Sequence, residues 1–570
     1  MQYIISYQQP TTHFIDIELV IDKINASELL LQLPAWRPGR YELGNFAKNI
    51  QKFQPFDENG NPLPFKKLKK DLWEITANQA KKIHVNYNYY AAEMNAGSSY
   101  LDANQLYVNG VNCLMFVPDY INEKCTLTLQ LPHDYQVATG LKAKSKHQFE
   151  AKDFHELVDS PFIASNSLQH HSFEQNKVLF HLWFQGECKP DFKKLELDFK
   201  KFIDAQINDF GGFPTEEYHF LFQILTYRTY HGVEHYNSTV IALGPSYEIM
   251  DEKGWYNELL GVSSHELYHT WNVKQIRPIE MHPYDYTKEN YTVLGYLDEG
   301  VTTYFGDKYL FTSGVFDWNQ YKNTFDKLLE RHYTNFGVEN MSVAASSFDT
   351  WLDGYVKGIP NRKGSIYTEG ALIAFITDVF IMKNTSNIKA LKDVMKLLYT
   401  DFAKKGKGIS DLDYKKSVEK IAGVSYNEIY DKLIHGTADF TPFLEEALIY
   451  IGCELKISPS NNYNEAKFGF KVRYENNSCI IDNVVPNTEA EKAGIAIGDE
   501  ILAINNIKLA NDLEHWSTYF GDDEQIITLK RALGKVENID LKQAKNNYFN
   551  NYQLLKQNEE SSNFKEWSKK

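Results

Sequence analysis

Residues 261–270 read Gly-Val-Ser-Ser-His-Glu-Leu-Tyr-His-Thr, and this stretch sets the character of the central part of the chain. His265 and His269 are four residues apart, so on a helix both imidazoles lie on one face and can reach one metal ion. Glu266 stands beside the first imidazole, where it can take a proton from a water that the metal activates. The window around the motif is apolar and competent to form a helix, which favours a metal site over a chance match.

A third ligand is available in the segment 294–305, Leu-Gly-Tyr-Leu-Asp-Glu-Gly-Val-Thr-Thr-Tyr-Phe, inside a predicted helix at 293–312. A catalytic zinc takes three protein ligands and keeps one position open. Glu299 can supply the third ligand, although a helix carboxylate of this kind is also commonly just solvated. The sequence therefore predicts a Zn²⁺ site made by His265, His269 and Glu299.

The overall composition is that of an ordinary globular protein. Of the 570 residues, 43% are hydrophobic and 24% are charged, and this length predicts several domains. Aromatic residues reach 14%, which indicates β-rich regions. The formal net charge of -15 argues against a nucleic-acid partner.

The cysteines and the first residues indicate the compartment. The cysteines are scattered and lack a Cys-x-x-Cys spacing, so we expect reduced, mostly buried thiols: Cys113, Cys125, Cys188, Cys453 and Cys479. The start, MQYIISYQQP, shows no basic region followed by an apolar run, and no stretch of about 18 apolar residues occurs. We therefore expect no signal peptide, no membrane partner and a cytoplasmic location.

Strand patterns dominate the first part of the chain, and helix patterns dominate the middle. Apolar and polar side chains alternate in 13–21, 82–90, 126–131 and 177–184. The apolar stripe of 195–210 predicts a helix. Further helices are expected at 256–273, 317–334, 366–382, 388–404 and 411–421, with Ser263 or Ser264 capping the helix of the histidine motif.

A third region runs from about 450 to 556. It contains short strand patterns at 479–485 and 500–507 around a small helical segment at 489–494. The residues after it, 557–570, are polar and include several lysines, which predicts a frayed end.

The central motifs resemble those of the gluzincin metallopeptidases. The pattern His-Glu-Leu-Tyr-His-Thr-Trp-Asn at 265–272, with Glu299 following His269 by 30 residues, looks most like the glycyl-aminopeptidase family. Residues 33–50, LPAWRPGRYELGNFAKNI, resemble that family's N-terminal β-domain signature. Residues 210–221, FGGFPTEEYHFL, resemble the entry to its catalytic domain.

The resemblance implies roles for residues that would otherwise be unremarkable. It makes Glu266 the general base and later the proton donor. Residues 230–235, YHGVEH, are similar to the family's Gly-Gly-Leu-Glu-His stretch, which implies that Gly232, Val233 and Glu234 line the substrate site. In related aminopeptidases the glutamate of this stretch binds the free α-amine, a role that falls on Glu234.

A second catalytic group is implied near residue 367. Residues 365–372, SIYTEGAL, resemble the family's Tyr-x-Lys-Gly-Ala segment, whose tyrosine donates a hydrogen bond to the oxyanion, so Tyr367 inherits this role. Two residues depart from the family. His231 stands where Gly is common, and Glu369 stands where Lys is usual. Both departures bear on substrate preference.

The third region resembles a PDZ domain. Its Phe468-Gly469-Phe470 loop is expected to offer backbone N–H groups to a peptide carboxylate, while the peptide adds as a strand. A purely structural PDZ domain that packs on the catalytic domain is an equal alternative. Residues 552–555 are expected to form a closing strand.

Together these features predict a multidomain α+β protein. We expect an N-terminal β-sheet domain at 1–168, a thermolysin-like, mostly helical zinc peptidase domain at 169–448, a PDZ domain at 449–556 and a polar tail at 557–570. The resemblance implies a zinc aminopeptidase that acts on peptides with a free N-terminus, after small residues such as Gly or Ala. The alternatives are a PDZ-led binding protein with a vestigial metallopeptidase domain, and a zinc endopeptidase.

Overall fold

The N-terminal part is built from strands, as the alternation of side chains predicts. The computed structural model describes every residue except 23, 25, 357, 546, 558–560 and 570. The main sheet has the order β12-β13-β10-β1-β2-β7-β4, and smaller sheets have the orders β11-β14-β9-β8 and β3-β6-β5. The elements are β1 Gln2–Ser6, β2 Phe14–Asp22, β3 Glu28–Gln32, β4 Ile50–Asp57, β5 Phe65–Lys69, β6 Leu72–Thr76, β7 Lys82–Tyr90, β8 Tyr100–Leu101, β9 Gln105–Val108, β10 Cys125–Leu129, β11 Gln136–Thr139, β12 Lys142–Ser145, β13 Gln148–Ala151, α1 Phe154–Val158 and β14 Phe162–Ser165.

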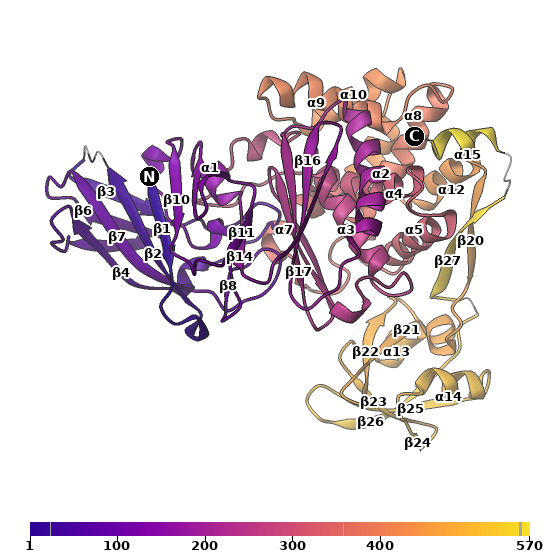
Figure 1. Ribbon diagram of the computed structural model, residues 1–570. Coiled ribbons are helices and arrows are strands. Elements are labelled where there is room, and N and C mark those ends of the chain that lie inside the picture. Colours follow the sequence, from indigo (N-terminus) through magenta and orange to yellow (C-terminus); the bar gives the residue numbers. More distant parts are fainter. Residues whose placement is uncertain (23, 25, 357, 546, 558–560, 570) are drawn as a thin grey trace.

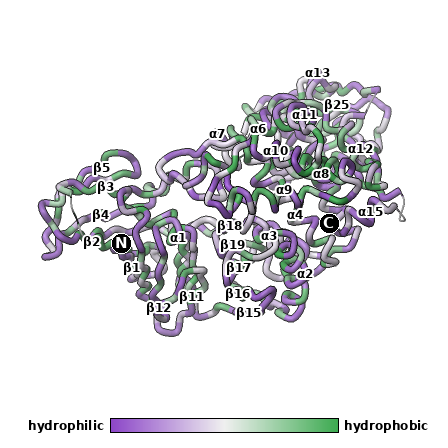
Figure 2. Tube along the Cα trace, turned by 90° about the horizontal axis from the view of Figure 1, so that it is seen from above, coloured by the Kyte–Doolittle hydropathy of each residue, from purple (hydrophilic) through white to green (hydrophobic). Residues whose placement is uncertain are grey.

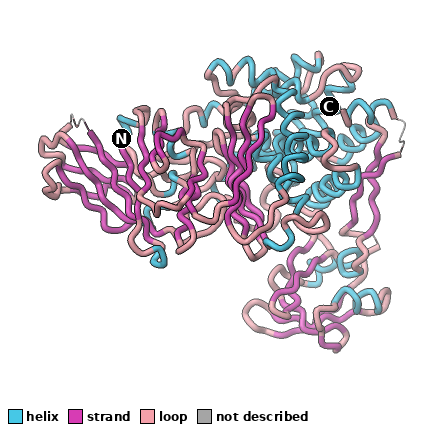
Figure 3. Tube along the Cα trace, in the orientation of Figure 1, coloured by secondary structure: helices cyan, strands magenta, loops and turns pink. Residues whose placement is uncertain are grey.

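The second domain opens with a sheet that stands between the N-terminal strands and the helices (Figures 1 and 3). Its order is β15-β16-β17-β19-β18, which leaves β18 at an edge. One face, with Phe180 and Phe220, packs on helices, and the other face, with Val240, packs on the N-terminal domain. Burial of both faces explains the nearly continuous apolar runs in these strands. The strands are β15 Gln169–Gln175, β16 Val178–Gln185, β17 Glu217–Ile224, β18 Thr229–Glu234 and β19 Ser238–Gly244.

Helices make up the rest of this domain. They are α2 Phe192–Phe210, α3 Tyr256–Tyr268, α4 Thr302–Thr312, α5 Trp318–Tyr333, α6 Val343–Phe348, α7 Thr350–Asp353, α8 Thr368–Asn384, α9 Leu391–Asp401, α10 Asp411–Ala422, α11 Asn427–Ile429 and α12 Thr441–Tyr450. The central helix is α8, which is mostly hydrophobic in Figure 2 and buried over most of its length. A helix that is apolar all round is stable only when it is enclosed in this way.

The C-terminal region projects from the helical domain on a two-stranded stem, β20 Cys453–Pro459 and β27 Asn550–Lys556 (Figure 1). The expected closing strand lies within β27. Beyond the stem, a sheet runs in the order β21-β22-β23-β25-β26 and has its own apolar core. Its elements are β21 Phe470–Glu475, β22 Ser478–Val484, α13 Glu489–Ala493, β23 Glu500–Ile504, β24 Ile507–Lys508, α14 Leu513–Phe520, β25 Gln525–Lys530 and β26 Val536–Leu541. The fold class is therefore the predicted one.

Two expectations were wrong. Neither Ser263 nor Ser264 caps a helix, because the apolar face continues upstream and α3 already begins at Tyr256. The chain also does not end in a frayed tail: Ser562–Trp567 form helix α15, and its Phe564 and Trp567 are buried in the core of the helical domain. Their spacing of three residues puts both rings on one helix face. Residues 558–560 and 570 of the expected tail lie outside the described residues.

No described helix combines the length and the apolar character needed to cross a lipid bilayer.

Candidate metal centre

Helix α3 and the turn that precedes α4 bring the predicted ligands together. His265 lies in the last turn of α3, and His269 follows directly at its C-terminal end. Glu299 was expected on a regular α-helix. It lies instead on a π-helical turn, Tyr296–Val301, that leads into α4. Helices α3 and α4 approach closely at Gly306, where an added Cβ would lie only 3.0 Å from the His265 Cα.

The donor atoms of these three residues face one point. The two Nε2 atoms of His265 and His269 are 3.1 Å apart, and they lie 3.8 Å and 3.4 Å from Glu299 Oε2. Metal–ligand bonds of about 2.1 Å arranged as a tetrahedron place ligand atoms about 3.4 Å apart. The set therefore fits one zinc ion, with His265, His269 and Glu299 as the residues that would hold it.

Hydrogen bonds around His269 fix the orientation of its imidazole. The backbone carbonyl of Asn272 lies 3.0 Å from His269 Nδ1 and accepts its proton, so Nε2 is the nitrogen that faces the other two ligands. The side-chain amide of Asn272 donates to the carbonyl of Leu297 at 2.8 Å and to Thr302 Oγ1 at 3.0 Å. One asparagine thus joins the histidine segment to the turn that carries Glu299.

The carboxylate of Glu299 and the two imidazoles shift the pKa values of one another. Burial alone would lower the pKa of His269, but the Glu299 carboxylate raises it to about 10. Burial would likewise raise the pKa of Glu299, but the two imidazoles lower it to about 2. A buried carboxylate held ionised beside two imidazoles is suited to a divalent cation.

Glu266 projects from α3 against the edge strand β18. An added Cβ on Gly232 would lie 2.2 Å from Glu266 Oε1, so only glycine allows this approach. Burial raises the pKa of Glu266 well above its ordinary value, and the carboxylates of Glu234 and Glu299 add to this effect. A carboxylate with a raised pKa is better matched to general-base work near neutral pH.

Glu234 closes one end of the site. It is 3% exposed, and its Oε1 atom has no hydrogen-bond partner among the described residues. The N-terminal loop covers it, because an added Cβ on Gly39 would lie 2.5 Å from Glu234 Oε2. The same loop places the Tyr41 hydroxyl 3.4 Å from Glu299 Oε1. An unpaired, buried carboxylate is a strong acceptor for a cationic group of a ligand.

Tyr367 stands at the other end of the site, just before α8. Its hydroxyl lies 3.5 Å from that of Tyr355. Burial and the nearby Glu299 carboxylate raise the pKa of Tyr367 well above its ordinary value, so the phenol keeps its proton and can donate it in a hydrogen bond. Glu369, one of the two departures, points elsewhere and lies 3.3 Å from His332 Nδ1.

Sequence comparisons agree with this organisation. The Peptidase M61 N-terminal domain profile matches residues 2–166, the M61 glycyl aminopeptidase profile matches residues 258–373, and a PDZ domain profile matches residues 456–534. Residues 2–166 and 258–373 thus resemble the two domains that define the M61 glycyl aminopeptidase family. A search of curated proteins found no match.

A comparison with solved structures finds a similar fold over the whole chain. An aminopeptidase N family protein from Idiomarina loihiensis is 26% identical, covers 99% of both chains and superposes with a TM-score of 0.92. An M1 zinc metallopeptidase from Deinococcus radiodurans, solved with a Tyr-Ser-Ala substrate, is 13% identical over 77% of this chain and 94% of that chain, with a TM-score of 0.49.

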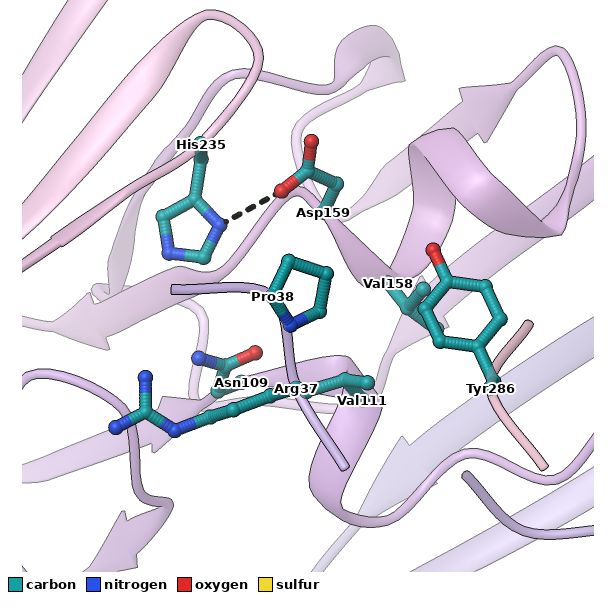
Figure 4. A pocket seen from close by; sticks show the side chains of 8 residues that line it. All are labelled: Arg37, Pro38, Asn109, Val111, Val158, Asp159, His235 and Tyr286. Atoms are coloured by element: carbon teal, nitrogen blue, oxygen red, sulfur yellow. Dashed lines mark hydrogen bonds and ion pairs between the residues drawn. The ribbon is translucent and has the colours of Figure 1, made fainter. Parts of the chain in front are cut away.

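The protein also contains a buried ion cluster that the sequence did not reveal. Asp159, from the N-terminal domain, lies 3.1 Å from His235 Nδ1 (Figure 4). The same carboxylate lies 2.9 Å from Lys274 Nζ. Burial opposes ionisation of Asp159, but Lys274 and His235 lower the pKa of its carboxyl to about 2. His235 follows Glu234 directly, and the Lys274 N–H donates to the carbonyl of His269 at 3.1 Å. One carboxylate therefore ties both catalytic segments to the N-terminal domain.

A second group of possible ligands, His181, Glu217 and His219, lies on the adjacent strands β16 and β17. The indole N–H of Trp183 donates to His219 Nδ1 at 3.2 Å, so the proton of a neutral His219 sits on Nε2. That Nε2 lies 3.8 Å from Glu217 and has no lone pair to offer. In this cluster the Glu217 carboxylate lies between the two imidazoles, and this arrangement does not favour a metal ion.

Proposed function

We propose that this protein is a zinc-dependent aminopeptidase that removes small N-terminal residues, Gly or Ala, from peptides. One observation carries the proposal: the His265, His269 and Glu299 donors converge a short way from Glu234, a buried carboxylate whose Oε1 atom has no partner among the described residues. A metal site next to an amine-binding carboxylate favours cleavage of the first peptide bond.

Each residue has a defined task in this proposal. Glu234 binds the α-ammonium of the substrate and Gly232 and Val233 line the strand beside it. A zinc ion held by the three ligands would polarise the carbonyl and the attacking water when bound. Glu266 takes a proton from the water while the water oxygen attacks the carbonyl carbon. It later gives that proton to the nitrogen of the leaving peptide. Tyr367 donates a hydrogen bond to the carbonyl oxygen as negative charge develops there.

The preference for small residues is supported by the resemblance to the glycyl aminopeptidase family.

A panel of aminoacyl chromogenic substrates, run with and without a chelator, tests the proposal. Zinc-loaded protein is expected to hydrolyse glycyl and alanyl substrates best and to lose activity on chelation. Glu266→Gln should retain zinc but turn over at least about 10²–10⁴-fold more slowly, because the amide cannot accept the proton. Full activity without metal, or normal activity of Glu266→Gln, would contradict the mechanism.

N-acetylation of a peptide substrate distinguishes an aminopeptidase from a zinc endopeptidase. Acetylation removes the positive charge that Glu234 would bind and adds bulk, so an acetylated alanyl peptide should resist cleavage while the free peptide loses single N-terminal residues. Efficient internal cleavage of the acetylated peptide would make the protein an endopeptidase.

The binding-protein alternative concerns the PDZ domain. Strand β21 lies at the edge of its sheet, and a peptide strand could add there. The aminopeptidase proposal is favoured because the chain retains both histidines, the third carboxylate, the base and the tyrosine. A vestigial enzyme would be free to lose one of them.

A further inference from the structure

A cleft of about 530 Å³ begins at Tyr367 and extends to the PDZ domain. This volume falls in the range of about 300–1,000 Å³ that is usual for ligand sites. One wall is the loop that leads into α8, which includes Tyr355, Val356 and Ile359. The facing wall comes from the PDZ domain through Asp482, Asn483 and Ile497. The cleft is thus shared by two domains and reaches Tyr367, one of the residues of the candidate active site.

The two ends of the active site differ in what they can accept. At the Glu234 end, the carboxylate is 3% exposed and the N-terminal loop covers it. Tyr367, which is proposed to bind the carbonyl oxygen of the cleaved bond, also lines the cleft. A peptide whose amine is bound at Glu234 would therefore extend past Tyr367 into the cleft, on the side that follows the cleaved bond.

The walls of the cleft present apolar side chains to solvent. Val356 is 66% exposed and Ile359 is 71% exposed on the catalytic side, and Ile497 is 37% exposed on the PDZ side. Two cations in the described part of the loop are already paired: Arg362 Nη1 lies 3.0 Å from Asp353 Oδ2, and Lys363 also binds Asp353. Exposed apolar side chains along a cleft are typical of a binding site for apolar groups.

The PDZ wall is held in place by polar contacts with the catalytic domain. The Asn483 side-chain amide donates to the carbonyl of Thr334 at 3.2 Å, and Lys471 Nζ lies 3.3 Å from Glu330 Oε1. Strands β20 and β27 add a second connection through the stem. The wall therefore has a defined position relative to Tyr367.

We propose that this cleft binds the part of a peptide substrate that follows the cleaved bond. The preferred substrates are then oligopeptides with apolar residues downstream, and the PDZ domain serves as one wall of the substrate site. This inference rests on the proposed aminopeptidase function, because that function sets the direction in which the peptide lies.

The test compares two substrates with the same first bond, the dipeptide Ala-Ala and the hexapeptide Ala-Ala-Leu-Leu-Ala-Ala, on zinc-loaded full-length protein. We expect kcat/KM to be roughly tenfold higher for the hexapeptide, an effect typical of a few added apolar contacts. Ile359→Glu and Ile497→Glu should each lower the hexapeptide-to-dipeptide ratio by roughly fivefold or more, because a carboxylate disfavours apolar residues there.

Matched controls separate the cleft from general effects of a new charge. Ile388 is 73% exposed and Leu533 is 100% exposed, and neither lines the cleft, so Ile388→Glu and Leu533→Glu should keep the wild-type ratio. Equal kcat/KM for both peptides in the wild type would overturn the cleft inference and leave the aminopeptidase intact. A ratio that falls equally in the controls would also overturn it. Hydrolysis of neither peptide would instead refute the proposed function itself.

Discussion

At the scale of single residues, a substitution of Tyr367 should distinguish a role in catalysis from a role in substrate binding. Its phenol keeps its proton because burial and Glu299 raise its pKa. Tyr367→Phe removes a donor aimed at charge that exists only during the reaction, so kcat should fall about 10²–10³-fold while KM changes little. Steady-state kinetics on an alanyl peptide measure kcat and KM. A change confined to KM would reduce Tyr367 to a residue that lines the site.

Asn272 is a second residue with a predictable effect. Its carbonyl accepts from His269 Nδ1 and its amide holds the turn of Glu299. Asn272→Ala keeps the backbone carbonyl but removes the side-chain amide that holds the turn of Glu299. Zinc affinity should therefore fall about 10–100-fold, the usual effect of losing outer contacts that orient a metal ligand. Competition with a chromogenic chelator measures the affinity. Gln275→Ala, in the same loop, is the control, and unchanged affinity in Asn272→Ala would show that the bridge does not tune the site.

Residue types predicted much of this site in advance. The spacing of His265 and His269 and the following Glu299 were enough to predict the ligand set, and the structure places their donor atoms together. Asn272, Asp159 and Lys274 were not predicted. Their effects depend on partners far away in the sequence, and no local pattern marks a residue of that kind.

At the scale of elements, the position of β18 relative to α3 depends on Asp159. Its carboxylate holds Lys274 and His235 at the junction of the N-terminal and catalytic domains. Asp159→Asn leaves a fully buried Lys274 without its counter-charge, which should lower the free energy of unfolding by about 3–5 kcal/mol. Denaturation in urea at neutral pH measures this loss.

The effect of Asp159 should also depend on pH with a definite sign. Its folded pKa is about 2 and its ordinary value is 3.8, so the ionised carboxylate stabilises the fold above 3.8 and this stabilisation is lost as the pH falls towards 2. The difference in stability between wild type and Asp159→Asn should therefore be constant above about pH 4 to 5 and narrow below it. The exposed Asp119→Asn variant should match wild type throughout. A difference that persists unchanged at the lowest pH would contradict the assignment.

Element types were easier to predict than their boundaries. The strand patterns at 13–21 and 82–90 became β2 and β7, which pair with Phe14 opposite Tyr90. The helix expected at 293–312 instead begins with a π-helical turn, Tyr296–Val301. Side-chain periodicity does not distinguish a single wide turn from a regular helix, and here tertiary hydrogen bonds from Asn272 hold the wider turn.

At the scale of the whole molecule, the C-terminal helix α15 locks the chain end onto the catalytic domain. Trp567 is 0% exposed, and its indole N–H donates to the Tyr304 hydroxyl at 3.2 Å. Trp567→Ala should lower the free energy of unfolding by about 3–5 kcal/mol, the usual cost of deleting a buried aromatic ring. Calorimetry or urea denaturation checks this value. Ser562→Ala, on the exposed start of the same helix, should change stability little, and an equally small effect of Trp567→Ala would mean that α15 is dispensable.

The sequence by itself determined which elements form and which side chains are available for catalysis. Period-two alternation predicted the strands, an apolar stripe predicted the helices, and the His-Glu-x-x-His spacing with Glu299 predicted a metal site, because these signals are carried by the spacing of residue types along the chain. Only the tertiary structure decided how the site is enclosed. Glu234 is covered by the Gly39 loop, Asp159 fastens the catalytic segments, and α15 docks through Trp567. These contacts join residues far apart in sequence, and their stability comes from burial and ion pairing that exist only once the domains have packed.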